Sequence, residues 1–578
     1  MANITFPGEL LSRPPAERLQ YFQGFTMAHP QLQDAKDALM TAIEDAAPGS
    51  LVFVFGPTGV GKTTLRLRAE QLITQKMLPE LDSDPGRLPY VSVEAIAPET
   101  GIFSWKEHFR RMLASMDEPL IDFKVVAPEL TDKRDTKWYQ VPDSRVMSTR
   151  LRYAVEQALS FRRPKAVFLD EAQHLAKMSS GRRLLDQLDV LKSTASRTQT
   201  VHVLVGTYDL LFFRNLSGQL SRRSVSIHFP RYRLDDEQEI DIFRNILLTF
   251  QDQLPLQTAP DLLTSWQFLY ERSIGCVGVL KEWLTRALAQ ALRGNQDTLT
   301  FAHLEVTALS VVQCQQMLSE AKAGEMMFAE GHDSRSRLQE ELGLREGVFG
   351  SVPKRSPQPE SAQGYPAARR RPESVNGTLN ETEWERGLLL MHSLYPDWPL
   401  TRRAVPPRSR LYHLAPVGVG TEHVETLTSY VTRLAAAHAV PVSKLVGHEI
   451  GPLAVRPKLG SQFATGTQRR FVPLINCQSY ILNASGYAAQ NWVTQLHHLT
   501  GEDKLRFLTT LCWNGAVSGE ELVRWYQAWC PQCYQGWRDA GEMLREPCSG
   551  CCGRFRCVHS IAGNSRPDAG TAGELPTF

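Results

Sequence analysis

The chain has 578 residues, with 64 lysines and arginines against 62 aspartates and glutamates, 42% hydrophobic residues and 22% charged residues. This composition is that of a globular protein with several domains, and it excludes wholesale disorder. The net charge of +2 neither indicates nor excludes nucleic acid, so any basic surface must be local. The longest apolar runs fall short of the roughly 18 residues of a membrane span, and the amino terminus lacks a signal-peptide pattern. We therefore expect a soluble cytoplasmic protein with no membrane partner.

Short β-branched runs alternate with long amphipathic stretches from Gln31 to Val312. This alternation predicts an α/β domain with a largely parallel sheet. The strand candidates are Leu51–Phe55, Tyr90–Val93, Ala166–Leu169 and Val201–Val205. After Pro230 the pattern becomes helical. We predict an N-terminal extension over residues 1–30, a nucleotide-binding core over 31–233 and a helical lid over 234–330.

A phosphate-binding motif follows the first predicted strand. Residues 56–63 read GPTGVGKT and match G-x-x-x-x-G-K-[ST] directly before a helical run. Such a loop curls its backbone N–H groups around phosphate oxygens, and the helix N-terminus adds its positive dipole. Lys62 is expected to reach the β- and γ-phosphates of ATP, and the Thr63 hydroxyl to bind Mg²⁺. The expected nucleotide-binding residues here are Gly56, Pro57, Thr58, Gly59, Val60, Gly61, Lys62, Thr63 and Thr64.

Two acidic residues, Asp170 and Glu171, end the apolar run that begins at Ala166. A buried strand in this position places Asp170 beside the metal ion of a phosphate-binding loop, and Glu171 can polarise the attacking water. The next predicted strand ends at Thr207, which offers a hydroxyl near the γ-phosphate. These residues predict an ATPase that uses Mg²⁺.

With these motifs the chain resembles the AAA+ ATPases, whose fold is an α/β P-loop core with a helical lid. The resemblance assigns Thr207 as the sensor of the γ-phosphate. It assigns Arg222 and Arg223 as candidates for the arginine that reaches a neighbouring subunit's nucleotide. Lys281 occupies the place of a second sensor in the lid. A surface arginine pair and an exposed helix lysine remain the alternative interpretations.

The resemblance is more specific over about residues 9–320, which are similar to the TnsC/TniB transposition ATPases. It rests on four phrases: Leu11–Arg18, Leu169–Leu175, Ile227–Tyr232 and Gly275–Trp283. It implies ATP-driven assembly into a ring or filament on double-stranded DNA, which recruits transposase subunits. It also implies DNA-backbone contacts on a short basic helix. These candidates are Trp105, Lys106, Arg110 and Arg111, and a solvated basic face on a core helix is the alternative.

A composition rich in Pro, Ser, Gly, Gln and Arg over residues 343–378 predicts a flexible linker. A second, mainly helical region is expected over residues 381–547. Within it, a helical stretch at Thr426–Ala435 is followed by a break at Ala439–Pro441 and a short helix at Ser443–Val446. Two short helices around a tight break indicate a helix-turn-helix that reads nucleic acid, although plain helical domains show the same pattern.

About residues 405–547 resemble the TniQ family, the target-selection partners of the same transposition systems. The resemblance rests on Arg408–Thr421 and on Trp525–Cys533. It implies a bacterial protein whose target DNA is chosen with a CRISPR effector or another target-site reader. It also implies a zinc-binding region that opens with Cys530 and Cys533, which supply two of the four ligands that tetrahedral Zn²⁺ needs.

The tail over residues 548–578 has two interpretations. At face value, Cys548 and Cys551 complete a C-x₂-C…C-x₂-C zinc set with the earlier pair. Alternatively, a frameshift near Pro547 has replaced the TniQ pattern. If the tail is back-translated and read in a shifted frame, the codons permit three further TniQ phrases in the family's order. We favour the frameshift, which leaves an irregular tail and half of a zinc site.

The sequence thus predicts an ATP-dependent DNA transposition regulator joined to a TniQ-like target selector. Two alternatives remain open: a nucleotide-binding adaptor without turnover, and a defence or signalling NTPase with a zinc-binding C-terminal module. The set of Lys62, Asp170 and Glu171 disfavours the adaptor, because each residue has a separate chemical role in hydrolysis. The phrase Arg408–Thr421 disfavours the signalling NTPase.

Overall fold

The structure is a computed structural model of the whole chain. It describes residues 6–97, 103–125, 144–175, 182–215, 224–328, 338–342, 395, 397–400, 405–421, 424–451, 482–483 and 486–513. The chain divides into two compact units. The first comprises residues 1–76, 92–103 and 165–404, and the second comprises residues 77–91, 104–164 and 405–578.

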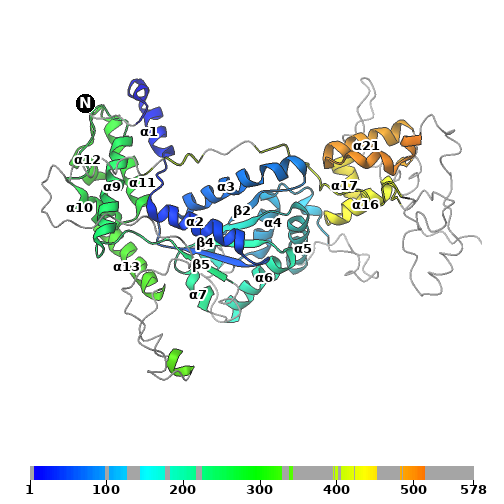
Figure 1. Cartoon of the computed structure of the whole chain (residues 1–578), viewed down its shortest axis with the longest axis horizontal. Helices are drawn as coiled ribbons and strands as arrows, with labels where there is room; N and C mark the ends of the chain where they lie inside the picture. The colour runs from blue at the N-terminus through cyan, green and yellow to red at the C-terminus, as the bar shows by residue number, and fades with distance from the viewer. Residues whose placement is uncertain are drawn as a thin grey trace, which may run out of the picture. The chain divides into compact units, whose positions relative to one another are not determined.

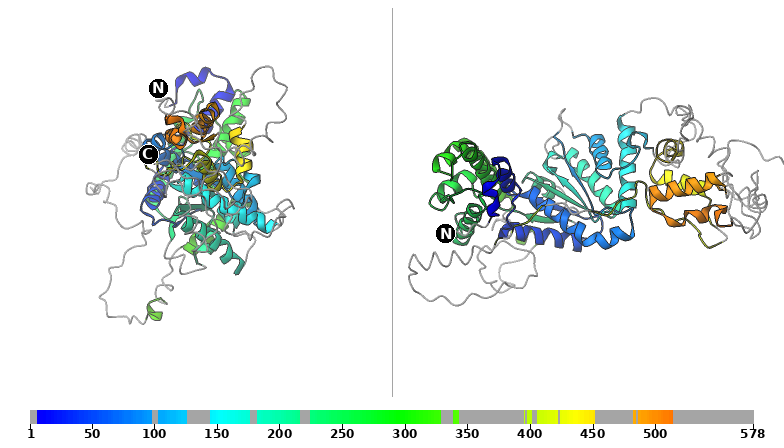
Figure 2. Two further views of the ribbon diagram at one scale, coloured as in Figure 1. Left: turned by 90° about the vertical axis from the view of Figure 1, so that its right-hand side faces the viewer. Right: turned by 90° about the horizontal axis from the view of Figure 1, so that it is seen from above.

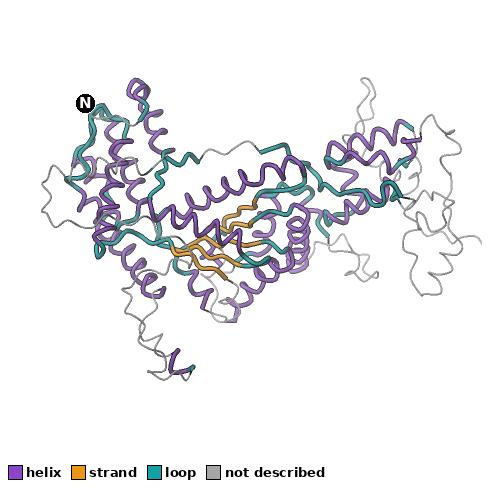
Figure 3. Tube along the Cα trace, viewed as in Figure 1, coloured by secondary structure: helices purple, strands orange, loops and turns teal. Residues whose placement is uncertain are grey.

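A five-stranded sheet forms the centre of the first half of the chain (Figure 1). Its strands are β1 (Leu51–Phe55), β2 (Tyr90–Glu94), β3 (Ala166–Asp170), β4 (Val201–Gly206) and β5 (Ser224–His228). The strand order is β2-β3-β4-β1-β5, and β1 pairs in parallel with both β4 and β5. Figure 3 shows these strands side by side among helices. The four predicted strands and the parallel sheet are confirmed.

Complete burial explains why three of these strands were recognisable in the sequence. Every residue of β1, β3 and β4 is buried, as in strands covered on both faces. Strand β5 alternates half-buried, exposed and buried residues, and it gave no continuous apolar run. It pairs with β1 in parallel, with Leu51 opposite Ser224 and Phe55 opposite His228.

Helices surround the sheet and continue into the lid. The helices that precede the lid and belong wholly or mainly to the first unit are η1 (Gly8–Ser12), α1 (Pro15–Gly24), α2 (Pro30–Asp45), α3 (Lys62–Ser83), η4 (Ala172–Leu175), α6 (Arg182–Thr198) and α7 (Leu210–Asn215). Helices α1 and α2 each begin with a proline. Proline is favourable there, because the N–H that it lacks would have no hydrogen-bond partner within the helix. Helix α3 begins at Lys62, so its N-terminus faces the phosphate-binding loop.

The region predicted to form a lid is helical where it is described. It contains α9 (Glu237–Gln253), α10 (Trp266–Ser273), α11 (Val277–Arg293), α12 (Phe301–Thr307) and α13 (Val311–Phe328). The lid helices lie beside α1 in Figure 1, and Phe22 and Phe25 of the N-terminal segment are part of the core around Trp283. The segment before residue 31 therefore contributes to the folded lid.

Residues just before position 400 are fastened to the first unit. The Trp398 N–H donates to the Thr26 carbonyl at 2.7 Å, and Asp397 Oδ1 accepts from the Thr26 N–H at 3.2 Å. The Trp398 ring lies under the guanidinium of Arg68 at 4.9 Å and near the ammonium of Lys36 at 5.6 Å. Such cation–π contacts add to the burial of the indole.

Besides the end of α3, the start of β2 and the non-helical stretch 405–421, the second unit is described mainly as helices. Its elements are α4 (Trp105–Ser115), η2 (Ile121–Phe123), α5 (Ser144–Arg162), α16 (Leu427–Ala437), α17 (Val442–Leu445), η5 (Val446–Ile450), α21 (Tyr487–Thr500), η6 (Asp503–Leu508) and η7 (Thr510–Trp513). Figure 2 shows the helices after residue 405 gathered in one group. Helices α16 and α17 flank the predicted break, and a DNA-reading role for them remains a prediction.

Among the described residues, no helix combines the length and the apolar character that a membrane crossing requires.

Candidate nucleotide site

The phosphate-binding loop connects β1 to α3 and has the backbone of an anion cradle. Gly59 and Gly61 have φ angles of +76° and +115°, which side chains rarely allow. At Gly56, a Cβ atom would lie 2.1 Å from the Phe229 carbonyl oxygen, so the neighbouring backbone excludes a side chain there. The backbone geometry therefore explains why glycine occupies these three positions of the motif.

Lys62 turns toward its own loop. Its Nζ donates to the carbonyl oxygens of Gly56 at 3.1 Å and Pro57 at 2.9 Å. Burial lowers the pKa of the ammonium to about 8, and the nearby charge of Glu171 opposes this shift. A cation that is buried against carbonyl dipoles at a helix N-terminus has the chemistry to receive phosphate oxygens.

Asp170 lies at the end of β3 within reach of α3. Its Oδ2 atom is 3.5 Å from the Thr63 hydroxyl and 2.9 Å from Arg66 Nε. Arg66 also donates to the Ser92 hydroxyl at 2.8 Å and pairs with Glu70. The structure thus brings the two predicted Mg²⁺ ligands together, with Arg66 balancing the charge of Asp170.

Gln173 connects the two residues that are predicted to act at the γ-phosphate. Its Nε2 atom donates to the Glu171 carboxylate, and its Oε1 atom accepts from the Thr207 N–H at 3.2 Å. A Cβ atom at Gly206 would lie 2.3 Å from the same Oε1, so the end of β4 is shaped around this carboxamide. Glu171 itself has a φ angle of +50°, an uncommon backbone conformation at the strand end.

The start of lid helix α11 touches the phosphate-binding loop. The Val279 N–H donates to the Gly59 carbonyl at 3.1 Å, and a Cβ atom at Gly278 would lie 2.4 Å from that oxygen. Lys281 points elsewhere in this structure, because its Nζ atom donates to the Gln23 carbonyl at 2.9 Å and to that of Phe25. The lid therefore meets the loop through Gly278 and Val279.

The predicted DNA contacts lie on α4. Lys106, Arg110 and Arg111 are exposed, whereas Trp105 is half-buried against Phe109. Arg110 pairs with Asp122 at 3.3 Å, and Arg111 pairs with Glu107 at 2.9 Å. The exposed basic face is present, and its binding of DNA remains a prediction.

Other predicted site residues lie outside the described residues. They are Arg222, Arg223, Cys530 and Cys533, together with the tail over residues 548–578. Among the residues that the structure does describe, no group of three or more His, Cys, Asp or Glu side chains is arranged to hold a metal ion.

The described residues fit ATP with Mg²⁺. Lys62, the glycine cradle and the α3 N-terminus would hold the phosphates, and Thr63 with Asp170 would hold the metal ion. Bound Mg²⁺ supplies charge neutralisation of the phosphate oxygens. Glu171 is oriented by Gln173 at the neighbouring strand ends.

Sequence reasoning missed Arg66 and Gln173. Arg66 is four residues after Lys62 and thus on the same side of the helix, which is the signal that could have indicated it. Gln173 stands two residues after Glu171, within the phrase Leu169–Leu175 that carries the family resemblance. Its contact with Thr207 links residues 34 positions apart, and local periodicity carries no such information.

The family comparisons agree with this geometry. Residues 46–212 match the family model of the AAA domain, so this part of the chain is an AAA+ ATPase domain. Residues 416–563 match the TniQ family model, so the chain carries an AAA+ ATPase domain followed by a TniQ domain. The second match begins after residue 405 and extends beyond Pro547. No curated protein matches the chain.

Several solved structures are similar to part of the chain. The ORC2 protein of Aeropyrum pernix is 15% identical, with 50% of this chain and 72% of that one covered and a TM-score of 0.33. A Walker-type ATPase of Pyrococcus abyssi is 16% identical, with coverage of 54% and 76% and a TM-score of 0.30. Drosophila ORC bound to DNA is 13% identical, with coverage of 57% and 84% and a TM-score of 0.31.

Proposed function

We propose that the protein is an ATP-dependent regulator of DNA transposition that assembles on target DNA and links target selection to the transposase. The observation that carries this proposal is one chain with both parts: a TniQ domain, and a P-loop site that contains Lys62, Asp170 and Glu171. The transposition-associated role in target selection follows from the AAA+ and TniQ pair. The assembly and the transposase partner are the proposed extension.

ATP hydrolysis is proposed to act as a timer for the assembly. The Glu171 carboxylate is the proposed base that orients the attacking water, with Thr207 near the γ-phosphate. Arg222 and Arg223 are proposed to reach the nucleotide of a neighbouring subunit and to neutralise transition-state charge. In this scheme ATP binding favours assembly on DNA, and hydrolysis releases it.

DNA contact is proposed for the exposed face of α4, through Trp105, Lys106, Arg110 and Arg111. Basic side chains with an aromatic neighbour suit contacts to a phosphate backbone that do not depend on sequence. Selection of the site is then assigned to the TniQ domain, with a CRISPR effector or another target-site reader as the proposed partner. Zinc at Cys530 and Cys533 is the proposed structural metal of that domain.

The decisive experiment is the Glu171→Gln variant of the full chain. We expect this variant to bind ATP as the wild type does, because Lys62 and the loop are unchanged, and to lose phosphate release. With duplex DNA and ATP it should accumulate DNA-bound assemblies that the wild type dissolves, as seen by sedimentation and electron microscopy. The matched control is Glu282→Gln, which changes an exposed carboxylate that pairs with Arg286 on α11.

The proposal fails if Glu171→Gln releases phosphate at the wild-type rate. Normal ATP binding by the wild type without any phosphate release would instead support the nucleotide-binding adaptor. DNA-independent turnover with no assembly would favour the signalling NTPase.

A further inference from the structure

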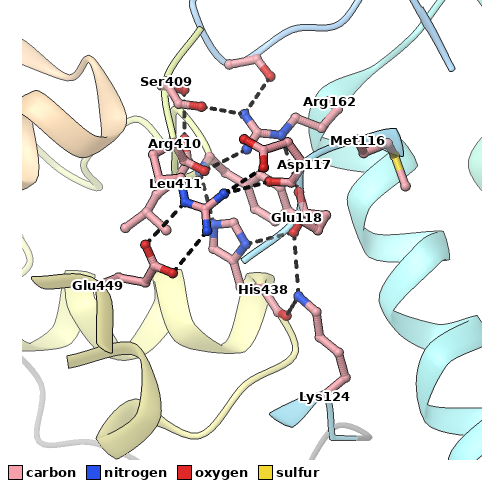
Figure 4. Close-up of polar contacts among 12 residues, drawn as sticks. Met116, Asp117, Glu118, Lys124, Arg162, Ser409, Arg410, Leu411, His438 and Glu449 are labelled. Carbon is pink, nitrogen blue, oxygen red and sulfur yellow. Dashed lines mark hydrogen bonds and ion pairs between the residues drawn. The ribbon is translucent and has the colours of Figure 1, made fainter. Parts of the chain in front are cut away.

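A buried ionic cluster within the second unit joins residues that precede position 164 to residues that follow position 405 (Figure 4). Its centre is Glu118, whose carboxylate lies 3.4 Å from Arg162 Nε and 3.5 Å from Lys124 Nζ. The same carboxylate lies 3.2 Å from His438 Nδ1. All four side chains are at most 1% exposed. Buried charges of this kind are stable when every partner is present, and removal of one partner is strongly destabilising.

The hydrogen bonds of His438 fix its protonation state. The Tyr412 N–H donates to Nε2 at 3.0 Å, so Nε2 is an acceptor and Nδ1 carries the proton toward Glu118. Burial lowers the pKa of His438 to about 4, and the imidazole is therefore neutral at pH 7. Burial alone would raise the pKa of Glu118. The hydrogen bond from His438 and the charges of Lys124 and Arg162 outweigh it and lower that pKa to about 2.

The two cations of the ATPase half also bind backbone oxygens of the later region. Arg162 donates to the carbonyls of Ser409 at 3.2 Å and Arg410 at 2.9 Å. Lys124 Nζ donates to the His438 carbonyl at 2.8 Å. The cluster therefore binds backbone carbonyls of the later region as well as the His438 side chain.

Direct backbone hydrogen bonds run between the same two regions. The Ser409 N–H donates to the Pro85 carbonyl at 2.9 Å, and the Val125 N–H donates to the Ala439 carbonyl at 2.7 Å. The fit is close, because a Cβ atom at Gly501 would lie 2.6 Å from Pro85 Cγ. Direct backbone hydrogen bonds and close packing are not expected for a domain that moves freely on a tether.

Two arginines of the later region hold the C-terminal end of α4. Arg408 donates to the Met116 carbonyl at 2.5 Å and pairs with Asp117 Oδ2 at 3.1 Å. Arg410 pairs with Asp117 Oδ1, also at 3.1 Å. Cations are favourable at this end of a helix because its free carbonyls carry partial negative charge.

We propose that the ATPase half carries a docking surface, made of residues 85–86, 116–125 and Arg162, for the segment 408–413 together with His438. The two regions then form one body by non-covalent contacts, and they stay joined when the chain between them is cut. If the function proposed above is correct, the target-selecting region is held in a fixed relation to the α4 helix and moves with it.

The test uses the full chain with a specific protease site inserted between Arg403 and Ala404. We expect the two fragments to co-elute in size-exclusion chromatography after cleavage. His438→Leu should weaken their association about 100-fold, because Glu118 loses a buried partner. Asp117→Arg should weaken it roughly tenfold by facing two arginines, and the added change Arg408→Asp should recover part of the loss.

The control variant is Arg286→Ala, which removes an arginine that pairs with Glu282 in the first unit and should leave the association unchanged. Amide hydrogen exchange on the uncut chain is the second measurement. We expect slow exchange at Val125 and Ser409, and faster exchange at both in His438→Leu. Separation of two folded fragments of the wild type, or exchange at loop rates at both amides, would overturn the proposal. If the fragments precipitate after cleavage, the exchange rates decide.

Discussion

The contact between Gln173 and Glu171 leads to a sharp kinetic prediction. The Gln173 carboxamide donates to a carboxylate and accepts from the Thr207 N–H at 3.2 Å. A hydrogen bond to a charged group contributes about 1.5–3 kcal/mol, which corresponds to roughly 10- to 150-fold in rate if it is needed to hold Glu171 in position. Gln173→Met should therefore reduce kcat by that factor. ATP affinity should stay within about threefold, because Lys62 is unchanged.

A second substitution separates the two hydrogen bonds of this residue. Gln173→Glu keeps an acceptor for the Thr207 N–H but loses the donor and adds a negative charge beside Glu171. It should be at least as slow as Gln173→Met. The control is Gln316→Met, which removes an exposed glutamine that donates to Glu320 at 2.8 Å. Steady-state phosphate release and equilibrium binding of a fluorescent ATP analogue supply kcat and affinity. Wild-type kcat in folded Gln173→Glu would refute the reasoning.

Two further predictions concern pH and salt. The folded pKa of His438 is about 4, below its ordinary value of 6.5, so the unfolded state takes up this proton first. The stability that neutral His438 contributes is thus complete above about pH 6.5 and is lost as the pH falls toward 4. Exchange at the Tyr412 amide, corrected for its intrinsic pH dependence, should rise over this range, and a flat corrected rate would contradict the assignment. For DNA, Lys106→Ala with Arg110→Ala should reduce the slope of log affinity against log salt by up to about 2, measured by fluorescence anisotropy. An unchanged slope would place the DNA surface elsewhere.

The sequence predicted the parts of the site that lie at strand ends. Lys62 follows β1, and Asp170 ends β3; both strands are continuous apolar runs, which are easy to recognise. Parallel strands bring their carboxyl ends to one edge, so the meeting of Thr63 with Asp170 followed from the motif order. The partners that complete the site were not predictable in this way. Arg66 and Gln173 act through hydrogen bonds across the fold.

The buried ionic cluster was hidden for a related reason. Glu118 and Arg162 belong to residue types that are mostly exposed, and the sequence indicates no burial for either of them. Glu118 is 44 positions from Arg162 and 320 from His438. Charged residues are buried when tertiary partners balance them, and tertiary partners at such separations leave no periodic signal. The division of the chain into two units consequently cuts across the order of its family domains.

The fastening of Trp398 changes how the segment between the lid and position 395 should be regarded. Helix α13 ends at Phe328, which packs against Phe55 of β1, and Trp398 is bound near Thr26 in the same unit. The intervening chain therefore leaves and rejoins the same unit, as an insertion between two fixed points does. Each doubling of such a loop adds about 0.6 kcal/mol of closure entropy. Nature or an engineer can therefore lengthen it, or place a passenger domain in it, at little thermodynamic cost.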